Sequence, residues 1–278
     1  MTWTRRRKNH CLRISKINIP MLFRISSCLL FFTCSEIIAK PIDIFFGTSG
    51  RNAEGIYHAT FNPENGKFTP SKLAAKIGSP GFLSMLPNGQ ILYSLGRWDG
   101  SAGTLGYHMG PKGELREFTR MACPDGSGAH IAVHPSGRFL ITAQYGGGSV
   151  AIFPLGKDGH LQKPTVIEHQ GGSKVVERRQ ESPHPHWTGF SPCGKYALIP
   201  DLGLDQIVIY KVDPNKPSLS KHGVAQSVPG GGPRHMRFSV DEKFIYLLNE
   251  LSLSVTTFAW DAGKGTAKRL STTPAISE

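Results

Sequence analysis

The feature that most constrains the fold of this chain is an internal repeat. Four segments share the same order of apolar runs and turn residues, at residues 81–96, 129–155, 185–213 and 233–261. One apolar slot recurs at spacings of 48, 57 and 48 residues and is filled by Met85, Val133, Phe190 and Phe238. A repeat of this period indicates one supersecondary unit that recurs along the chain and packs against its neighbours.

Each repeat is a set of short predicted strands. Its apolar runs are 5–8 residues long and are bounded by Gly, Pro, Asn or Asp. Three or four antiparallel strands in about 48 residues are typical of a β-propeller blade. Residues 42–70 predict two more strands with a turn at Asn65–Gly66. We therefore expect an all-β fold, a β-propeller of four-stranded antiparallel blades; a β-sandwich is the alternative, although it need not repeat at a constant period.

The net charge of +12 is concentrated near the N-terminus. Residues 1–40 hold eight basic side chains and one acidic side chain, which leaves +5 for residues 41–278. This mild excess suits a small anionic substrate. It argues against a dedicated nucleic-acid-binding protein, because such proteins concentrate Lys and Arg in a stripe.

Residues 1–39 are predicted to be a signal or targeting segment, followed by the propeller domain in residues 40–278. The apolar core, residues 25–34, has the length of a signal-peptide core and is too short to span a bilayer. It predicts export to the periplasm or outside the cell, with no membrane span after its removal; without a signal the protein would be cytoplasmic. A buried strand is the alternative interpretation. An exported protein would also allow a disulfide between Cys123 and Cys193.

The order of strands in a blade also predicts where its polar residues lie. The residues before each first strand and those after each second strand share one rim of a propeller. Those before the first strands are His130, His184, His186, Arg234 and His235; those after the second strands are Gln144, Tyr145, Asp201, Asn249 and Glu250. The turns on the opposite rim carry bland polar residues. This asymmetry predicts a functional site on the first rim.

Three stretches carry a resemblance to a known family: SPHPHWTGFSPCGKYALIPDLGLDQIVIY, GGGPRHMRFSVDEKFIYLLNEL and AVHPSGRFLITAQYGGGSVAIFPL. They resemble the seven-bladed propeller lactonases, which include one type of 6-phosphogluconolactonase and the fungal-type 3-carboxy-cis,cis-muconate lactonizing enzyme. The similarity runs from about Ile42 to about Asp261. The chain departs from the family at three positions. It has Gln144 where Asn is usual, Pro200 where Ala is usual, and Glu242 where Gly is usual.

The resemblance implies both an architecture and a site. A closed ring of seven such blades needs roughly 330 residues, so we expect about five of the seven blades and a C-terminally truncated form. Such an open arc would expose edge strands. In the muconate-type members the proposed site is a histidine, an arginine and a glutamate, which match His186, Arg234 and Glu250. The position of the family's second arginine would fall beyond Glu278.

The expected chemistry is hydrolysis of a sugar lactone of the 6-phosphogluconolactone type. This reaction needs a base, a donor for the developing oxyanion, and a group that binds the substrate's anion. We expect His186 or Glu250 to be the base and Arg234 to bind a phosphate or carboxylate. The expected substrate-binding residues are His130, Tyr145, His235 and Asn249.

Alternatives remain open for several of these residues. For Arg234 and Glu250 the alternative is a structural ion pair, for His130 a satisfied rim histidine, and for Asn249 a support for its loop. His184, between two prolines, is expected to be structural. A metal clamp by His184 and His186 is a further alternative, but no third ligand stands at a diagnostic spacing, so we predict no metal and no cofactor.

The expected partner is a small anionic lactone, with no nucleic acid; the sequence predicts no oligomeric state. Two other functions compete with lactone hydrolysis. One is an isomerase that closes a carboxymuconate to its lactone. The other is a non-catalytic extracytoplasmic propeller that binds a ligand or a protein on the same rim.

Overall fold

The computed structural model of the chain describes residues 40–276, apart from positions 51, 127 and 214. These residues belong to one compact unit, and this part of the chain contains strands and no helix. Accordingly, no helix among the described residues has the length and apolar character to cross a membrane. The predicted targeting segment, residues 1–39, lies outside the described residues, so the signal and the export stay predictions.

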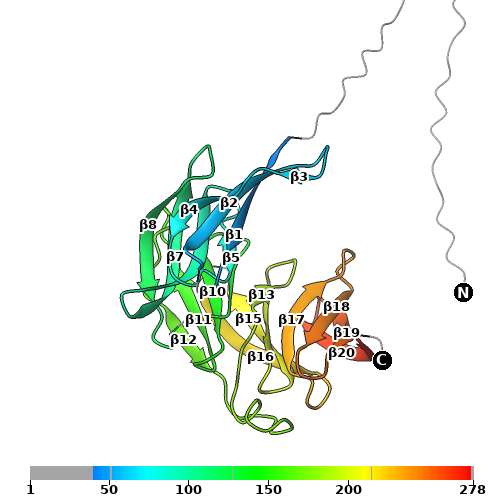
Figure 1. The fold of residues 1–278 in the computed structure, drawn as a ribbon. Coiled ribbons are helices and arrows are strands. Elements are labelled where there is room, and N and C mark those ends of the chain that lie inside the picture. The colour runs from blue at the N-terminus through cyan, green and yellow to red at the C-terminus, as the bar shows by residue number, and fades with distance from the viewer. Residues whose placement is uncertain (1–39, 51, 127, 214, 277–278) are drawn as a thin grey trace, which may run out of the picture. The chain divides into compact units, whose positions relative to one another are not determined.

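The strands form five antiparallel sheets of four strands each (Figure 1). The first two sheets consist of β1 (Ile42–Gly47), β2 (Gly55–Asn62), β3 (Lys67–Phe68) and β4 (Lys72–Lys76), and of β5 (Leu83–Met85), β6 (Ile91–Trp98), β7 (Ser101–Met109) and β8 (Leu115–Ala122). The third sheet has β9 (His130–Val133), β10 (Phe139–Gln144), β11 (Ser149–Pro154) and β12 (Thr165–Glu168). The last two have β13 (Gly189–Phe190), β14 (Tyr196–Asp201), β15 (Gln206–Asp213) and β16 (Ser218–Gln226), and β17 (Pro233–Phe238), β18 (Phe244–Asn249), β19 (Ser254–Asp261) and β20 (Thr266–Pro274).

The four predicted repeats are the last four sheets, in which the strands pair in chain order. The all-β propeller predicted from the repeat is therefore confirmed. The first sheet differs in detail from the prediction of two strands. β3 is a two-residue continuation of the hairpin that turns at Asn65–Gly66, and β4 pairs with the same strand, β2. The alternating pattern over residues 42–62 is strong enough to predict β1 and β2, whereas β3 is too short to leave a pattern.

The core lies between successive sheets rather than inside any one of them. Four clusters of buried apolar side chains each join two neighbouring sheets. Strand β10 shows how this works, because Leu140 packs toward the second sheet while Phe139 and Ile141 pack toward the fourth. All its residues are buried. Since burying such a side chain contributes about 1.5–3 kcal/mol, these two-sided strands hold neighbouring blades together.

The two cysteines of the propeller, Cys123 and Cys193, are not bridged. Cys123 is buried in the core between the second and third sheets, whereas Cys193 is exposed, and both are free thiols. The alternative of a disulfide between them is therefore wrong for this structure.

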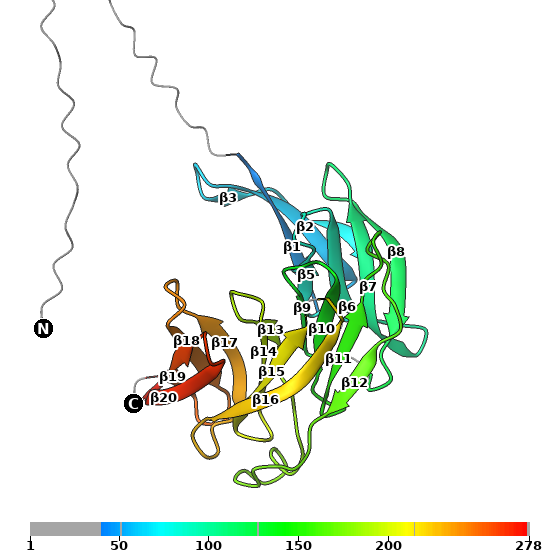
Figure 2. The ribbon, with the colours of Figure 1, turned by 180° about the vertical axis from the view of Figure 1, so that it is seen from behind.

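The inner strands of the sheets, β5, β9, β13 and β17, come together on one side (Figures 1 and 2). Contacts join β5 to β9 and β9 to β13 directly, and β17 to the fourth sheet through β14. Because each repeat contributes the same strand to this side, residues at equivalent positions of different blades become neighbours.

The turn after each inner strand needs a left-handed residue. Three repeats have glycine there, Gly89, Gly137 and Gly194, with φ of 73°, 68° and 71°. Glu242 takes the same conformation in the last sheet, with φ of 60°. A residue with a side chain is strained there by about 1–2 kcal/mol. The departure from the family's usual glycine therefore carries a cost in stability.

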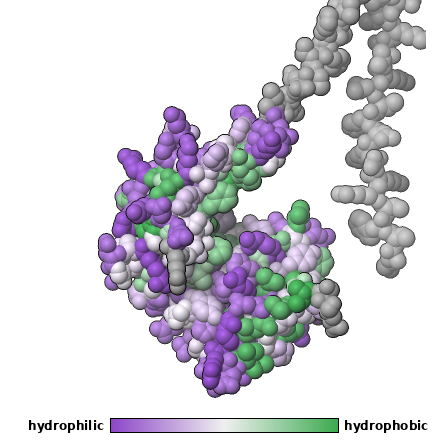
Figure 3. All heavy atoms as spheres, in the orientation of Figure 1, coloured by the Kyte–Doolittle hydropathy of each residue, from purple (hydrophilic) through white to green (hydrophobic). Residues whose placement is uncertain are grey.

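The first and the last sheet each expose apolar side chains on one face. In β18 the side chains alternate, so that Ile245 and Leu247 are fully buried while Tyr246 and Leu248 are 45% and 40% exposed. Apolar surface gathers over this last sheet in Figure 3. In the first sheet Phe46 is 41% exposed. The strand at the outer edge of the last sheet, β20, is also exposed along almost all of its length.

Candidate active site

Glu250 is the centre of a charged cluster on the predicted rim. Its carboxylate lies between two guanidinium groups: Arg179 Nη2 donates to Oε1 at 2.5 Å, and Arg234 Nε donates to Oε2 at 2.8 Å. Burial acts to raise the pKa of Glu250, but the hydrogen bonds from Arg179 and Arg234 outweigh it and hold the pKa below its ordinary value. The carboxylate is therefore ionised at neutral pH.

His186 lies beside this cluster. Its Nε2 is 3.8 Å from Glu250 Oε2, and its ring stands edge-on to that of Tyr145, with centroids 5.4 Å apart. Nδ1 is buried, and no described residue gives it a hydrogen-bond partner. Burial first, and then the charge of Arg234, lower the pKa of His186, which keeps the imidazole neutral at neutral pH. The structure thus brings together His186, Arg234 and Glu250 from two different sheets.

Two predicted substrate-binding residues, His130 and His235, adjoin His186. Their ring centroids are 5.7 Å apart, and His235 is 5.5 Å from His186. Phe82 packs against the rings of His130 and His235. Burial is the main cause that lowers the pKa of His130 to about 3 and that of His235 to about 4, and neighbouring histidine and arginine charges add to it. The site therefore holds three uncharged imidazoles next to two arginines.

Of these three histidines, His130 lines a cavity of about 500 Å³. The inner strands line it, and its polar lining includes Ser84, His130, Thr188 and Arg237. Trp187 forms part of the wall, with the Arg237 guanidinium 5.6 Å from the centre of its ring. This volume falls within the usual range for small-molecule sites.

Asn249 corrects one of the sequence predictions. Its side chain is fully buried, and both ends are occupied: Oδ1 accepts from the Ser227 hydroxyl, and Nδ2 donates to Ser254 and Thr256. It therefore has no free group to offer a substrate. Asn249 instead fixes the loop that begins at Glu250, which is the alternative that the sequence left open.

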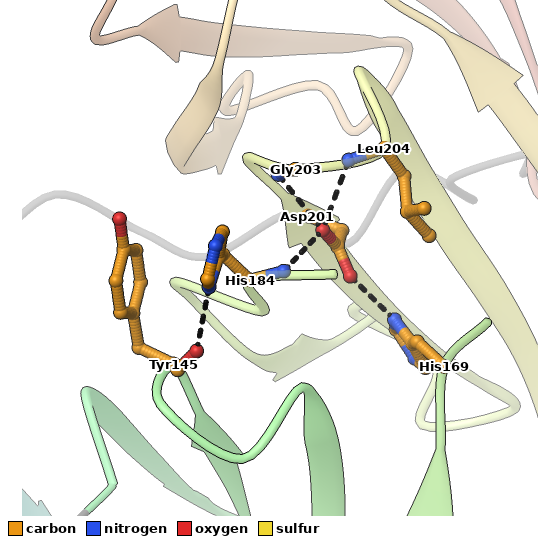
Figure 4. A network of polar contacts seen from close by, with 6 residues as sticks. All are labelled: Tyr145, His169, His184, Asp201, Gly203 and Leu204. Carbon is orange, nitrogen blue, oxygen red and sulfur yellow. Dashed lines mark hydrogen bonds and ion pairs between the residues drawn. The ribbon is translucent and has the colours of Figure 1, made fainter. Parts of the chain in front are cut away.

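A buried polar network supports the rim (Figure 4). Asp201, fully buried at the end of β14, accepts through Oδ1 from the backbone N–H groups of His184, Gly203 and Leu204. Its Oδ2 lies 2.6 Å from Nδ1 of His169, which is also buried. The carboxylate thus fixes the segment that leads to His186 and the turn between β14 and β15.

The ring of His184 continues this network toward the site. Nδ1 donates to the Tyr145 carbonyl oxygen at 2.9 Å, and the ring stacks on that of Tyr145 with centroids 4.6 Å apart. Tyr145 in turn contacts His186. His184 therefore supports Tyr145. Both histidine rings contact the Tyr145 ring, but Nδ1 of His184 bonds the Tyr145 carbonyl oxygen, whereas Nε2 of His186 lies near Glu250. The described residues hold no group of three His, Cys, Asp or Glu side chains arranged around one point.

Arg179 is the rim residue that the sequence reasoning missed. It lies in the connection between β12 and β13, outside the repeated pattern, so no strand position predicted it. One signal was available. The spacing between the second and third repeats, which form the third and fourth sheets, is 57 residues rather than 48, so this connection is longer than the others.

Fold and site together define a β-propeller protein with an arginine- and histidine-rich site at the inner ends of its sheets. Comparison with known proteins places it more narrowly. The profile of the family described as "Lactonase, 7-bladed beta-propeller" matches residues 43–278. The chain belongs to this family of seven-bladed β-propeller lactonases.

Individual relatives are similar over most of the chain. The 6-phosphogluconolactonase of Bacillus subtilis is 34% identical over 227 residues, covering 81% of this chain and 64% of the relative. That of Formosa agariphila is 31% identical, covering 76% and 62%. A solved structure described as a periplasmic gluconolactonase of Pseudomonas aeruginosa has 30% identity and a TM-score of 0.78, covering 86% of this chain and 69% of that one. The chain spans less than two thirds of the length of the two curated relatives.

Proposed function

We propose that the protein hydrolyses a sugar lactone at the rim site. The observation that carries the proposal is the ionised Glu250 held between Arg179 and Arg234, beside the neutral imidazole of His186. Relatives named 6-phosphogluconolactonase and gluconolactonase support the same class of substrate. Both names denote enzymes that act on a lactone, whose ring opens when water attacks its carbonyl carbon.

In the proposed reaction, neutral His186 is the general base. Its imidazole takes a proton from the attacking water, and the lactone carbonyl becomes a tetrahedral oxyanion. A fixed N–H donor of the site stabilises this negative charge, as such donors do in other acyl transfers. Collapse breaks the ring C–O bond, and the imidazolium returns its proton to the departing alkoxide. Glu250 stays ionised and holds the two arginines in place.

The experiment measures turnover by the full chain. Hydrolysis of 6-phosphogluconolactone, gluconolactone and carboxymuconolactone is followed above the spontaneous rate, with identification of each product. We expect hydrolysis of a sugar lactone, and a loss of about 10²–10⁴-fold in kcat/KM in His186→Ala, the range for a general base. His160→Ala is the control, because His160 is 54% exposed and pairs with Asp158 on the surface.

Two outcomes would overturn the proposal. Turnover of carboxymuconolactone alone would assign the isomerase, which a site with two arginines also suits because that substrate carries several carboxylates. Ligand binding on the rim without turnover of any lactone would assign the non-catalytic propeller.

We also propose that residues 1–39 direct the protein out of the cytoplasm. The apolar core of the segment and the description of the Pseudomonas relative as periplasmic support this proposal. Cell fractionation of the full chain tests it. Export requires the chain in the extracytoplasmic fraction and its retention in the cytoplasm when residues 1–39 are removed; equal distribution of both forms would contradict it.

A further inference from the structure

We propose that Arg179 and Arg234 together bind an anionic group of the substrate, a phosphate or a carboxylate, and that Arg179 is the residue that selects for it. The inference rests on the proposed function and specifies its substrate class.

The charges of the cluster leave room for an anion. Two guanidinium groups face a single carboxylate, so one positive charge is uncompensated, and the adjacent His186 and His235 are neutral. Both arginine side chains are 41% exposed. Arg179 gives one Nη2 bond and Arg234 one Nε bond to Glu250, so each keeps further N–H donors. Arginine donors in this geometry match the oxygens of phosphate and carboxylate.

The segment that carries Arg179 is fixed in advance. The neighbouring Gln180 is fully buried; its Nε2 donates to the Leu202 carbonyl oxygen at 2.8 Å and to Asp205 Oδ1 at 2.6 Å, and its Oε1 accepts from the Val176 N–H. Arg179 therefore enters the site from a loop whose backbone is held by a buried amide. A side chain on such a loop loses little conformational freedom when it binds a ligand.

Asp205 joins the two arginines into one unit. Its carboxylate, 4% exposed, accepts from Gln180 on one side and from the backbone N–H groups of Gly230 and Gly232 on the other. Gly230 and Gly232 lead into β17, which carries Arg234. The same buried carboxylate thus positions the segments that carry both guanidinium groups, and Glu250 lies between the two groups and accepts a hydrogen bond from each.

The alternative is that Arg179 only holds Glu250 in a structural ion pair. The two explanations predict different effects of losing Arg179 on the affinity for a neutral ligand. If Arg179 only positions Glu250, its loss weakens neutral and anionic ligands alike. If it binds the anion, its loss weakens only the anionic ligand.

The experiment is calorimetric binding to the full chain of glucose, glucose 6-phosphate and glucuronate, which differ only in the group at C6. Arg179→Ala and Arg179→Lys are compared with Arg178→Ala. Arg178 is the matched control, because it is the adjacent arginine, is 87% exposed and lies 3.8 Å from Glu177 rather than near the site. Thermal unfolding of each variant shows that it is folded, and Arg179→Gln replaces any variant that is not.

We expect at least one anionic ligand to bind more tightly than glucose. Arg179→Ala should weaken that ligand about 10–100-fold, the value of a lost charged hydrogen bond, with glucose unchanged. Arg179→Lys should recover part of the loss, and Arg178→Ala should lose nothing. The phosphate and carboxylate arms show which anion is selected.

Equal weakening of all three ligands, or no effect of Arg179→Ala, would overturn this inference even if the protein hydrolyses a lactone. Selective weakening without turnover of any lactone would keep the anion site and overturn the proposed function. Failure of all three ligands to bind would overturn the anion site.

Discussion

Replacing Asp201 tests how the buried network supports the rim. In Asp201→Ala, three backbone N–H groups lose their acceptor, and Nδ1 of His169 loses its partner. At about 1 kcal/mol each, the low end for unsatisfied buried donors, the backbone groups alone cost about 3 kcal/mol. The loss of the His169 bond brings the total to the range of about 3–5 kcal/mol seen when one partner of a buried pair is removed.

Asp201→Asn is the matched variant. Its amide oxygen keeps the position of Oδ1 and its three backbone donors, so only the contact with His169 changes. Here His169 must present Nδ1 as an acceptor to the new amide, and the expected cost is about 1–2 kcal/mol.

Equilibrium urea unfolding of both variants measures these costs, and kcat/KM on the substrate found above measures the effect on the site. We expect Ala to cost at least about 1 kcal/mol more than Asn and to lower kcat/KM further, because the segment that ends in His186 loses its anchor. Equal costs for the two variants, or less than about 1 kcal/mol for Ala, would refute the reasoning, since the three backbone donors would then not depend on Asp201.

Three further predictions follow from the structure. Glu242→Gly should raise the free energy of unfolding by about 0.5–1 kcal/mol, because the relief of left-handed strain exceeds the entropy that glycine adds to the unfolded chain; a loss of stability in urea unfolding would contradict this. Gly203→Ala should cost about 1–3 kcal/mol and lower activity, because its methyl group would overlap the Ser182 carbonyl oxygen, whereas Gly146→Ala meets open space and should change neither. The free energy of unfolding should fall as the pH is lowered from 6.5 toward 4: burial lowers the folded-state pKa of His130 to about 3 and of His235 to about 4, so the unfolded state binds more protons in this window. Urea unfolding at both pH values measures the change, and a His235→Phe variant with undiminished pH dependence would exclude His235 as a cause.

The sequence predicted those parts of the molecule that obey the repeat. Because blades are equivalent, the strand positions of His186, Arg234 and Glu250 were sufficient to place them on one rim. Arg179 was not predicted, because it lies in a connection with no equivalent in the other blades. Asn249 shares the rim by position, yet its side chain turns inward, because Ser254 and Thr256 on β19 provide partners for its amide. Side-chain direction at the end of a strand depends on such partners, which a pattern of strands does not contain.

The pH dependence of kcat/KM for the full chain, between pH 4.5 and 7, tests the central claim most directly. Since the proposed base is neutral His186, with a pKa lowered below 6.5 by burial and by Arg234, activity should be constant near pH 7 and fall as the pH passes below that pKa. The residual rate of His186→Ala should lack this limb. An unchanged acidic limb in His186→Ala, or a rate equal to that of the unsubstituted chain, would contradict the account.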